Sequence, residues 1–176
     1  MLHKAIFYAT IILYISHANQ GETNMKRKEQ AMTYFREGYN CAQSVFLAFC
    51  DLTGFDQKTA LHLAAPFGGG IGRQREVCGA VSGMCLVAGA LYGYDDTKNK
   101  DAKAAHYKMV QELCARFRKR AGGSILCRDL LGAEGRDTAA TPADRTQAYY
   151  EKRPCVELVG EAADILEQWI KKHPIA

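Results

Sequence analysis

Cysteine is the residue type in this sequence that could carry chemistry. The 176 residues include seven cysteines, and because seven is odd, a framework made only of disulfides would leave one thiol over. No two cysteines have the C-x-x-C spacing that zinc fingers and thioredoxin-type sites use. Any shared site must therefore be assembled by the fold.

Four of the cysteines fall where the sequence predicts the first turn of a helix. These are Cys41, Cys78, Cys127 and Cys155. Asn40 and Gln43 have the spacing of a capping box around the first of them, and a glycine-rich loop directly precedes the second. Ser124 is the expected N-cap before the third, and Pro154 is the expected first helical residue before the fourth.

A helix start has chemical consequences for a thiol. Its free N–H groups carry about half a positive charge, which favours the thiolate. The pKa of a cysteine in that position can fall from about 8.5 to below about 7.5. Thiolate is the form that attacks disulfides and binds metals. If the four helix starts converge, they form a redox or metal site; otherwise these cysteines are inert core residues.

The other cysteines serve as an internal comparison. Cys50 is expected to end a helix, whereas Cys85 and Cys114 lie well inside helices. Because free cysteine is often buried as a small apolar residue, we expect these three to be packing residues.

The elements that must position the cysteines are helices, because hardly any stretch alternates apolar and polar residues. The expected helices cover residues 26–36, 41–49, 57–65, 77–92, 101–120, 125–131 and 154–172, with a loop at 132–149. The segment 77–92 is apolar nearly all round, which is typical of a central buried helix. The sequence therefore predicts an all-α fold, a single compact bundle whose helix starts gather the four cysteines.

Length and composition are those of one globular domain, which we expect at residues 25–176. Residues 1–24 form a leader, either a signal-like segment with cleavage after Ala18 or an upstream extension before a start at Met25. We favour Met25 and a cytoplasmic protein; a true signal over residues 1–18 would make it exported. The net charge of +4, without a basic cluster, makes nucleic acid a poor partner, and no segment predicts a stable membrane span.

The glycine-rich loop at residues 67–72 follows no strand and lacks the nucleotide-loop pattern, so its glycines are expected to turn the chain close to sulfur. Gly79 and Gly83, four residues apart, are expected to let another helix approach. Arg73 and Arg75 are interpreted as a solvated loop face, with stabilisation of nearby thiolates as the alternative. The histidines show no ligand spacing.

Several motifs together resemble the C_GCAxxG_C_C family of redox-active proteins. They are NCAQSV at residues 40–45, FGGGIGRQREVCGAVSG at 67–83, CRDLLG at 127–132 and the final Cys155 before an amphipathic helix. The resemblance extends from about Met25 to Trp169. It implies that Cys41, Cys78, Cys127 and Cys155 are the family's four cysteines, and it implies redox activity and iron–sulfur binding without naming a substrate.

Three functional hypotheses follow for the four-cysteine site. The first is electron transfer through an iron–sulfur cluster, because clusters are held by four cysteine thiolates. The second is a thiol–disulfide redox protein in which the same cysteines are catalytic. The third is structural, either zinc held by all four cysteines or two stabilising disulfides. The sequence specifies no reaction and no oligomeric state, and the expected partner is a redox protein of unknown identity.

Overall fold

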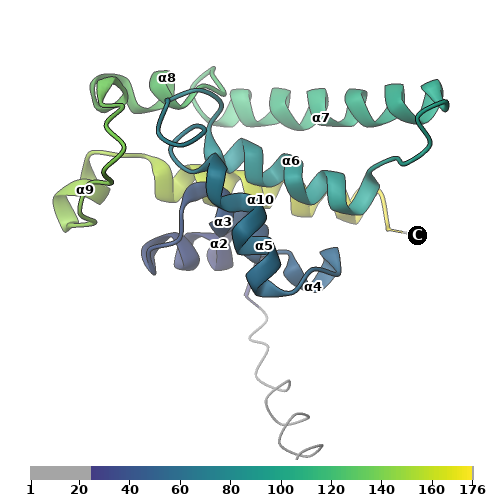
Figure 1. The fold of residues 1–176 in the computed structure, drawn as a ribbon, viewed down its shortest axis with the longest axis horizontal. Coiled ribbons are helices and arrows are strands. Elements are labelled where there is room, and N and C mark those ends of the chain that lie inside the picture. The colour runs from purple at the N-terminus through teal and green to yellow at the C-terminus, as the bar shows by residue number, and fades with distance from the viewer. Residues whose placement is uncertain (1–24, 176) are drawn as a thin grey trace, which may run out of the picture.

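The computed structural model describes residues 25–175, and this part of the chain contains helices and no strand. The elements in order are α2 (Arg27–Arg36), α3 (Cys41–Leu47), α4 (Cys50–Thr53), α5 (Gln57–Ala64), η1 (Ala65–Phe67), α6 (Gly79–Tyr92), α7 (Lys100–Arg120), α8 (Cys127–Leu131), η2 (Gly132–Arg136), α9 (Gln147–Glu151) and α10 (Cys155–Lys172) (Figure 1). The expected all-α fold is confirmed. The proposed leader, residues 1–24, lies outside the described residues.

The last helix, α10, organises the core, because it packs against α2, α3, α6 and α7. Its apolar residues recur every three or four positions, so they share one face of the helix. That face is buried as the periodicity predicts, through Val156, Leu158, Val159, Ala162, Ile165, Leu166 and Trp169.

Helices α3 and α6 pack closely through two glycines of α6. A Cβ atom at Gly83 would lie 2.6 Å from the carbonyl oxygen of Ala42, and one at Gly79 would lie 3.0 Å from the Cβ of Cys41. The first distance is too short for any side chain larger than hydrogen, and at Gly79 the Phe67 carbonyl oxygen, 2.8 Å from such a Cβ, sets the same limit. The expected close approach at these glycines is therefore confirmed, and it brings the starts of the two helices together.

Several expected boundaries are wrong. The expected helix 41–49 ends at Leu47, because Phe49 leaves the helical conformation and a separate short helix begins at Cys50. The expected loop 132–149 contains η2 and the start of α9, where the Thr146 hydroxyl accepts a hydrogen bond from the Tyr149 N–H. Only Met109, Leu113 and Phe117 of α7 are buried, so the first two turns of that helix stay outside the core.

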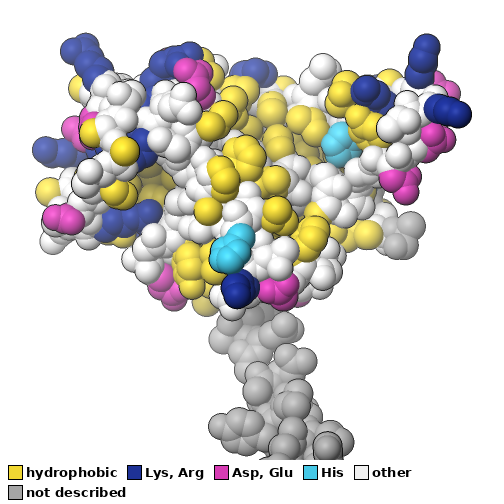
Figure 2. Space-filling model, in the orientation of Figure 1, with side chains coloured by type: hydrophobic (Ala, Val, Ile, Leu, Met, Phe, Trp, Pro, Cys, Tyr) yellow, Lys and Arg dark blue, Asp and Glu magenta, His cyan; other side chains and the backbone are white. Residues whose placement is uncertain are grey.

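Helix α6 is less enclosed than its composition suggests. One side packs in the core, but Leu86, Gly89 and Ala90 line a groove of about 690 Å³ that is closed on the other side by residues of α3, α5 and the glycine loop. Apolar side chains gather over this face in Figure 2. Between residues 25 and 175, no helix combines the length and the hydropathy that crossing a membrane requires.

Candidate redox site

The four cysteines predicted from the sequence come together at one end of the bundle. The Cys41 and Cys155 thiols are in hydrogen-bond contact, and both lie near enough to Cys78 and Cys127 for their charges to interact. Cys41, Cys127 and Cys155 line one cavity of about 240 Å³, whereas Cys78 is buried with 4% of its surface exposed. The fold therefore joins four segments that are far apart in the sequence.

Cys41 is positioned by the cap of α3. The Asn40 side-chain oxygen accepts hydrogen bonds of 3.0 Å from the backbone N–H groups of Ala42 and Gln43, and the Gln43 side chain accepts one from the Asn40 N–H. This is the capping box that the sequence predicts. The Asn40 amide also donates to the Ala65 carbonyl, which ties the start of α3 to the end of α5.

Cys78 and Cys127 are held together through the backbone. The Cys78 N–H donates to the Ile125 carbonyl at 2.8 Å, the Cys127 N–H donates to the Glu76 carbonyl at 2.6 Å, and Val77 forms an isolated antiparallel bridge with Leu126. Cys78 is the N-cap residue of α6, and Cys127 is the first residue of α8. The sequence suggested Ser124 as the N-cap of α8, but the N-cap is Leu126. The Ser124 hydroxyl accepts a hydrogen bond from the Leu126 N–H.

The glycine-rich loop packs against Cys127. A Cβ atom at Gly70, where φ is 72°, would lie 2.7 Å from the Cβ of Cys127. Arg73 and Arg75 also have positive φ angles, of 69° and 62°, which non-glycine residues adopt at an energetic cost. The loop thus brings its backbone against the side chain of Cys127.

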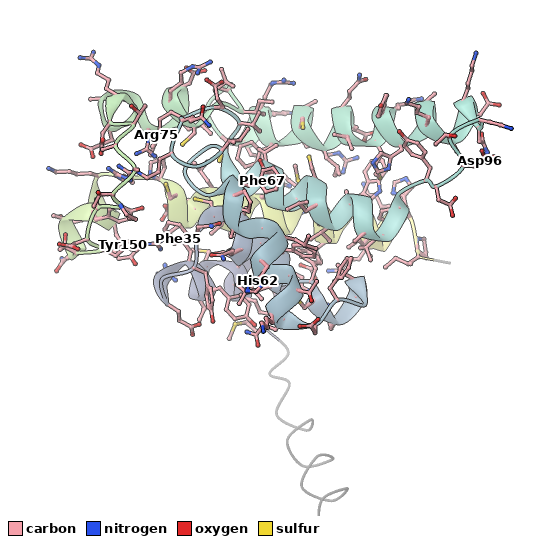
Figure 3. All side chains as sticks on the ribbon, viewed as in Figure 1. Phe35, His62, Phe67, Arg75, Asp96 and Tyr150 are labelled. Carbon is pink, nitrogen blue, oxygen red and sulfur yellow. The ribbon has the colours of Figure 1, made fainter. Side chains whose placement is uncertain are left out.

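Arg75 is not solvated, which corrects our interpretation of the loop. It is only 3% exposed, and its guanidinium group lies beside the Cys127 sulfur, where it opposes the rise in pKa that burial causes at that thiol. The side chain is drawn inwards because its Nε–H donates to the Asp137 carbonyl at 2.7 Å. Arg73 forms an ion pair with the Asp137 carboxylate at 2.7 Å. In Figure 3, Arg75 lies at the same end of the molecule as Phe35 and Tyr150.

Cys155 is the first residue of α10, with Pro154 as the N-cap rather than as the first helical residue. The preceding Arg153 is 8% exposed and stacks on Tyr149 at 4.6 Å from the ring centroid. Its Nη2 donates to the Glu134 carboxylate at 3.0 Å. A fixed cation therefore stands two residues before the cysteine.

The four thiols differ in acidity, and only Cys155 has a lowered pKa. The hydrogen bond with Cys41 lowers the pKa of Cys155, and the nearby charges of Arg153, Arg145 and Arg75 act in the same direction. The same hydrogen bond, together with burial, raises the pKa of Cys41.

At Cys78 and Cys127, burial is the largest influence on the pKa of the thiol. It raises the pKa of Cys78 to about 12, although hydrogen bonds from the N–H groups of Ala80 and Val81 oppose it. Burial also raises the pKa of Cys127. Loss of water is thus the largest influence on the pKa at Cys78 and Cys127, whereas at Cys41 it comes second to the hydrogen bond with Cys155.

Four arginines line the cavity beside the thiols, and no carboxylate of residues 25–175 does. They are Arg73, Arg75, Arg145 and Arg153. Arg145 donates to the carbonyls of Phe35 and Tyr39 and lies over the Phe35 ring. Sequence reasoning missed Arg145 and Arg153. The second stands two residues before Cys155, which is a usable signal, whereas nothing in the spacing marks the first.

The other three cysteines lie outside this site. Cys50 begins α4 instead of ending a helix, so helix position alone does not distinguish the four. Cys85 of α6 and Cys114 of α7 form a second thiol pair, joined by a hydrogen bond that lowers the pKa of Cys114 to about 7 and raises that of Cys85. All three are half-buried.

Within residues 25–175, no three or more histidine, cysteine or acidic side chains are arranged to hold one metal ion. A tetrahedral zinc ion would therefore need the cysteines to move. An iron–sulfur cluster has a different requirement, because a two-iron cluster is held by two cysteines at each iron. The Cys41 and Cys155 thiols are in contact, and backbone hydrogen bonds join the segments of Cys78 and Cys127, so each pair would serve one iron.

Comparison with known proteins identifies the family. No curated protein and no solved structure matches the chain. A family model described as "Putative redox-active protein (C_GCAxxG_C_C)" matches residues 39–169. This stretch includes the four cysteines of the site and the four arginines of the cavity. The chain belongs to the C_GCAxxG_C_C family of redox-active proteins.

Proposed function

We propose that the protein is a thiol–disulfide redox protein that cycles between a Cys41–Cys155 dithiol and the corresponding disulfide. The observation that carries this proposal is the contact between these two thiols at the wall of a cavity. Neither residue is fully buried, so a substrate can reach them. This changes the preference drawn from the sequence, which favoured a cluster.

The two cysteines take different roles. Cys155 is the attacking thiolate, because Cys41 and three arginines stabilise its negative charge. It attacks one sulfur of a disulfide substrate, forms a mixed disulfide and releases the first thiolate. Cys41 then gives up its proton and attacks the Cys155 sulfur, which releases the second thiolate. Two protein thiols are oxidised and one substrate disulfide is reduced to two thiols.

The second attack requires Cys41 to lose its proton only after Cys155 has reacted. While Cys155 is a thiolate, the Cys41 S–H group donates to it, which keeps Cys41 protonated and unreactive. Once Cys155 is bonded to the substrate, that acceptor charge is gone. The pKa of Cys41 then loses one of the influences that raise it, so the second attack follows the first.

An iron–sulfur cluster for electron transfer is the second candidate. It is favoured by the meeting of four cysteines in two pairs and by the N–H groups of Ala80 and Val81 that donate to Cys78. Cys41, Cys78, Cys127 and Cys155 would hold the cluster, and the four arginines would offset its negative charge. When bound, a cluster would supply one-electron transfer. The buried position of Cys78 suits a ligand better than an attacking thiol.

One preparation distinguishes the candidates. The full chain is purified without oxygen, and its visible spectrum, iron and acid-labile sulfide are measured. It is then treated with glutathione disulfide and its tryptic peptides are mapped by mass spectrometry. We expect a colourless, iron-free protein that forms a Cys41–Cys155 disulfide.

Cys50→Ser is the matched control, because it removes a half-buried cysteine outside the site and should leave this disulfide unchanged. A brown protein that contains iron and sulfide, and that needs all four cysteines to retain them, would instead establish the cluster.

A further inference from the structure

The cavity beside Cys41 and Cys155 has an unbalanced positive charge. Arg73 and Arg153 have carboxylate partners, in Asp137 and Glu134. Among the described residues, Arg75 and Arg145 form no ion pair with a carboxylate: both guanidinium groups donate to backbone carbonyls, and that of Arg75 also lies against the Cys127 sulfur. Two charges without counterions at one small cavity are costly, because burial removes the water that would screen them.

Two of the guanidinium groups also have donors without acceptors. Nη2 of Arg75 and Nε of Arg153 are shielded from water and have no hydrogen-bond partner. Their residues are 3% and 8% exposed, and both line the cavity. A buried donor without a partner is destabilising, so a bound acceptor that either guanidinium group could reach by a small rotation would be stabilised.

These observations point to an anionic ligand rather than to a neutral or cationic one. Arginine binds carboxylate and phosphate through paired N–H groups, which gives stronger hydrogen bonds than neutral donors do. The thiolate of Cys155 alone would balance only one of the two unpaired charges. The cavity of about 240 Å³ also admits a small molecule, or the end of a larger one, rather than a folded partner.

We propose that this arginine-lined cavity binds a small disulfide that carries carboxylate groups, and that it presents the disulfide to Cys155. The proposal rests on the proposed thiol–disulfide function and specifies its substrate class. Arg75 and Arg145 receive the carboxylate, whereas Cys41 and Cys155 lie in the same wall and receive the sulfur atoms. The exchange is the one described above: one substrate disulfide becomes two thiols, and the two cysteines form the disulfide.

Phe35 and Tyr149 complete the wall and explain how the arginines are held. The Arg145 guanidinium group lies 4.2 Å from the centroid of the Phe35 ring and 5.7 Å from that of Tyr149. Stacking on aromatic faces orients a guanidinium group. Arg145 is thus fixed by two rings and by the carbonyls of Phe35 and Tyr39, and the second N–H of each Nη remains for a ligand.

The test compares an anionic disulfide with a neutral one. 5,5′-Dithiobis(2-nitrobenzoate) carries two carboxylates, and 4,4′-dithiodipyridine is neutral at pH 7. Each reacts with reduced, metal-free protein in a stopped-flow instrument. The rate at Cys155 is the phase that Cys155→Ser removes. For each protein, the ratio of the anionic to the neutral rate is divided by the same ratio for a free neutral thiol, N-acetylcysteine amide.

We expect the normalised ratio to be well above one and to fall about tenfold in Arg75→Gln and in Arg145→Gln. Arg75→Lys should keep part of the preference, because it keeps the charge and loses the planar fork. Because both rates come from the same protein, changes in thiol acidity or in the folded fraction cancel. Arg118→Gln, which removes an exposed charge on α7, is the matched control and should leave the ratio unchanged.

The outcomes separate the two proposals. If both disulfides react at Cys155 with a normalised ratio near one in every protein, the cavity does not select anions and the substrate inference is wrong, while the thiol–disulfide function stands. If neither disulfide produces a phase that depends on Cys155, the proposed function itself fails.

Discussion

At the scale of single residues, neighbours set the acidity of each thiol more than helix position does. Cys41, Cys127 and Cys155 all begin helices, yet only Cys155 has a lowered pKa. It differs from the other two because another thiol donates to it and several guanidinium groups surround it. Cys114 follows the same rule without a helix start, since Cys85 donates to it and Arg118 lies one turn away.

The Cys114 thiol should therefore titrate near neutral pH. We expect its rate of alkylation by iodoacetamide to rise between about pH 6 and pH 8 and then to level off, because the thiolate is the reactive form. The midpoint should lie at about 7. Peptide mapping after short exposures measures the rate at each pH.

Cys85→Ala removes the donor and should move that midpoint upwards, towards the value of an ordinary thiol. Cys50 is the comparison within the same protein: burial raises its pKa, so its alkylation should still be increasing at pH 9, a value reached in the same series. A Cys114 profile identical to that of Cys50 would contradict the assignment.

At the scale of elements, the contact between α3 and α6 connects stability with the site. Gly83 lies against the backbone of Ala42, one residue after Cys41. Because backbone atoms cannot rotate away as a flexible side chain can, a larger residue there must push α3 as a whole. Any such movement also displaces Cys41 from Cys155.

Gly83→Ala should lower the free energy of unfolding by about 1–3 kcal/mol, since overpacking a tight contact costs that much. The measurement is urea unfolding followed by circular dichroism. The rate of Cys41–Cys155 disulfide formation with glutathione disulfide should fall in the same variant.

The chain provides a matched control in the same helix. A Cβ atom at Gly89 would meet no atom within 4 Å, so Gly89→Ala should stabilise the protein by up to about 1 kcal/mol through helix propensity. Equal effects of the two alanines would mean that the approach of α3 and α6 is not what matters.

At the scale of the whole molecule, the site is a product of complete folding. Cys41, Cys78, Cys127 and Cys155 are separated by long stretches of sequence. The helices of Cys41, Cys78 and Cys155 pack on one another, and backbone hydrogen bonds tie the segment of Cys127 to that of Cys78. No single segment contains two of them. The close thiol pair should therefore exist only when the entire bundle is formed.

We accordingly expect a single unfolding transition in urea. In increasing urea, the fraction of reduced protein that forms the Cys41–Cys155 disulfide in a short pulse of oxidant should fall with the same midpoint as the helical circular dichroism signal. Tryptophan fluorescence should give that midpoint too, because Trp169 is buried on α10. A pulse signal that persists after the helices have melted would show that the pair forms locally.

Much of the fold and the identity of the four site cysteines could be predicted from the sequence, because the relevant signals are local. The capping box at Asn40, the apolar face of α10 and the paired glycines of α6 all depend on residues within a few positions of each other. The resemblance in motifs then selected the same cysteines that the fold brings together.

What could not be predicted depends on distant residues. Arg75 looks like a loop residue until the Asp137 carbonyl draws it inwards from 62 positions away. The pairing of Cys85 with Cys114 likewise requires the docking of α6 on α7. Charge alone gave no hint of the cavity, because the net charge is modest and its arginines are spread over the chain.

The backbone clamp between residues 76–78 and 125–127 has a consequence for redesign. Its hydrogen bonds join main-chain N–H and carbonyl groups, so they do not depend on the side chains of Val77, Ile125 or Leu126. Those positions can be exchanged for other apolar residues without altering the spacing of Cys78 and Cys127. Gly70 has no such freedom, since any larger residue there would press on Cys127 itself. The cysteine spacing is thus robust to variation at its own neighbours and vulnerable at one glycine in a preceding loop.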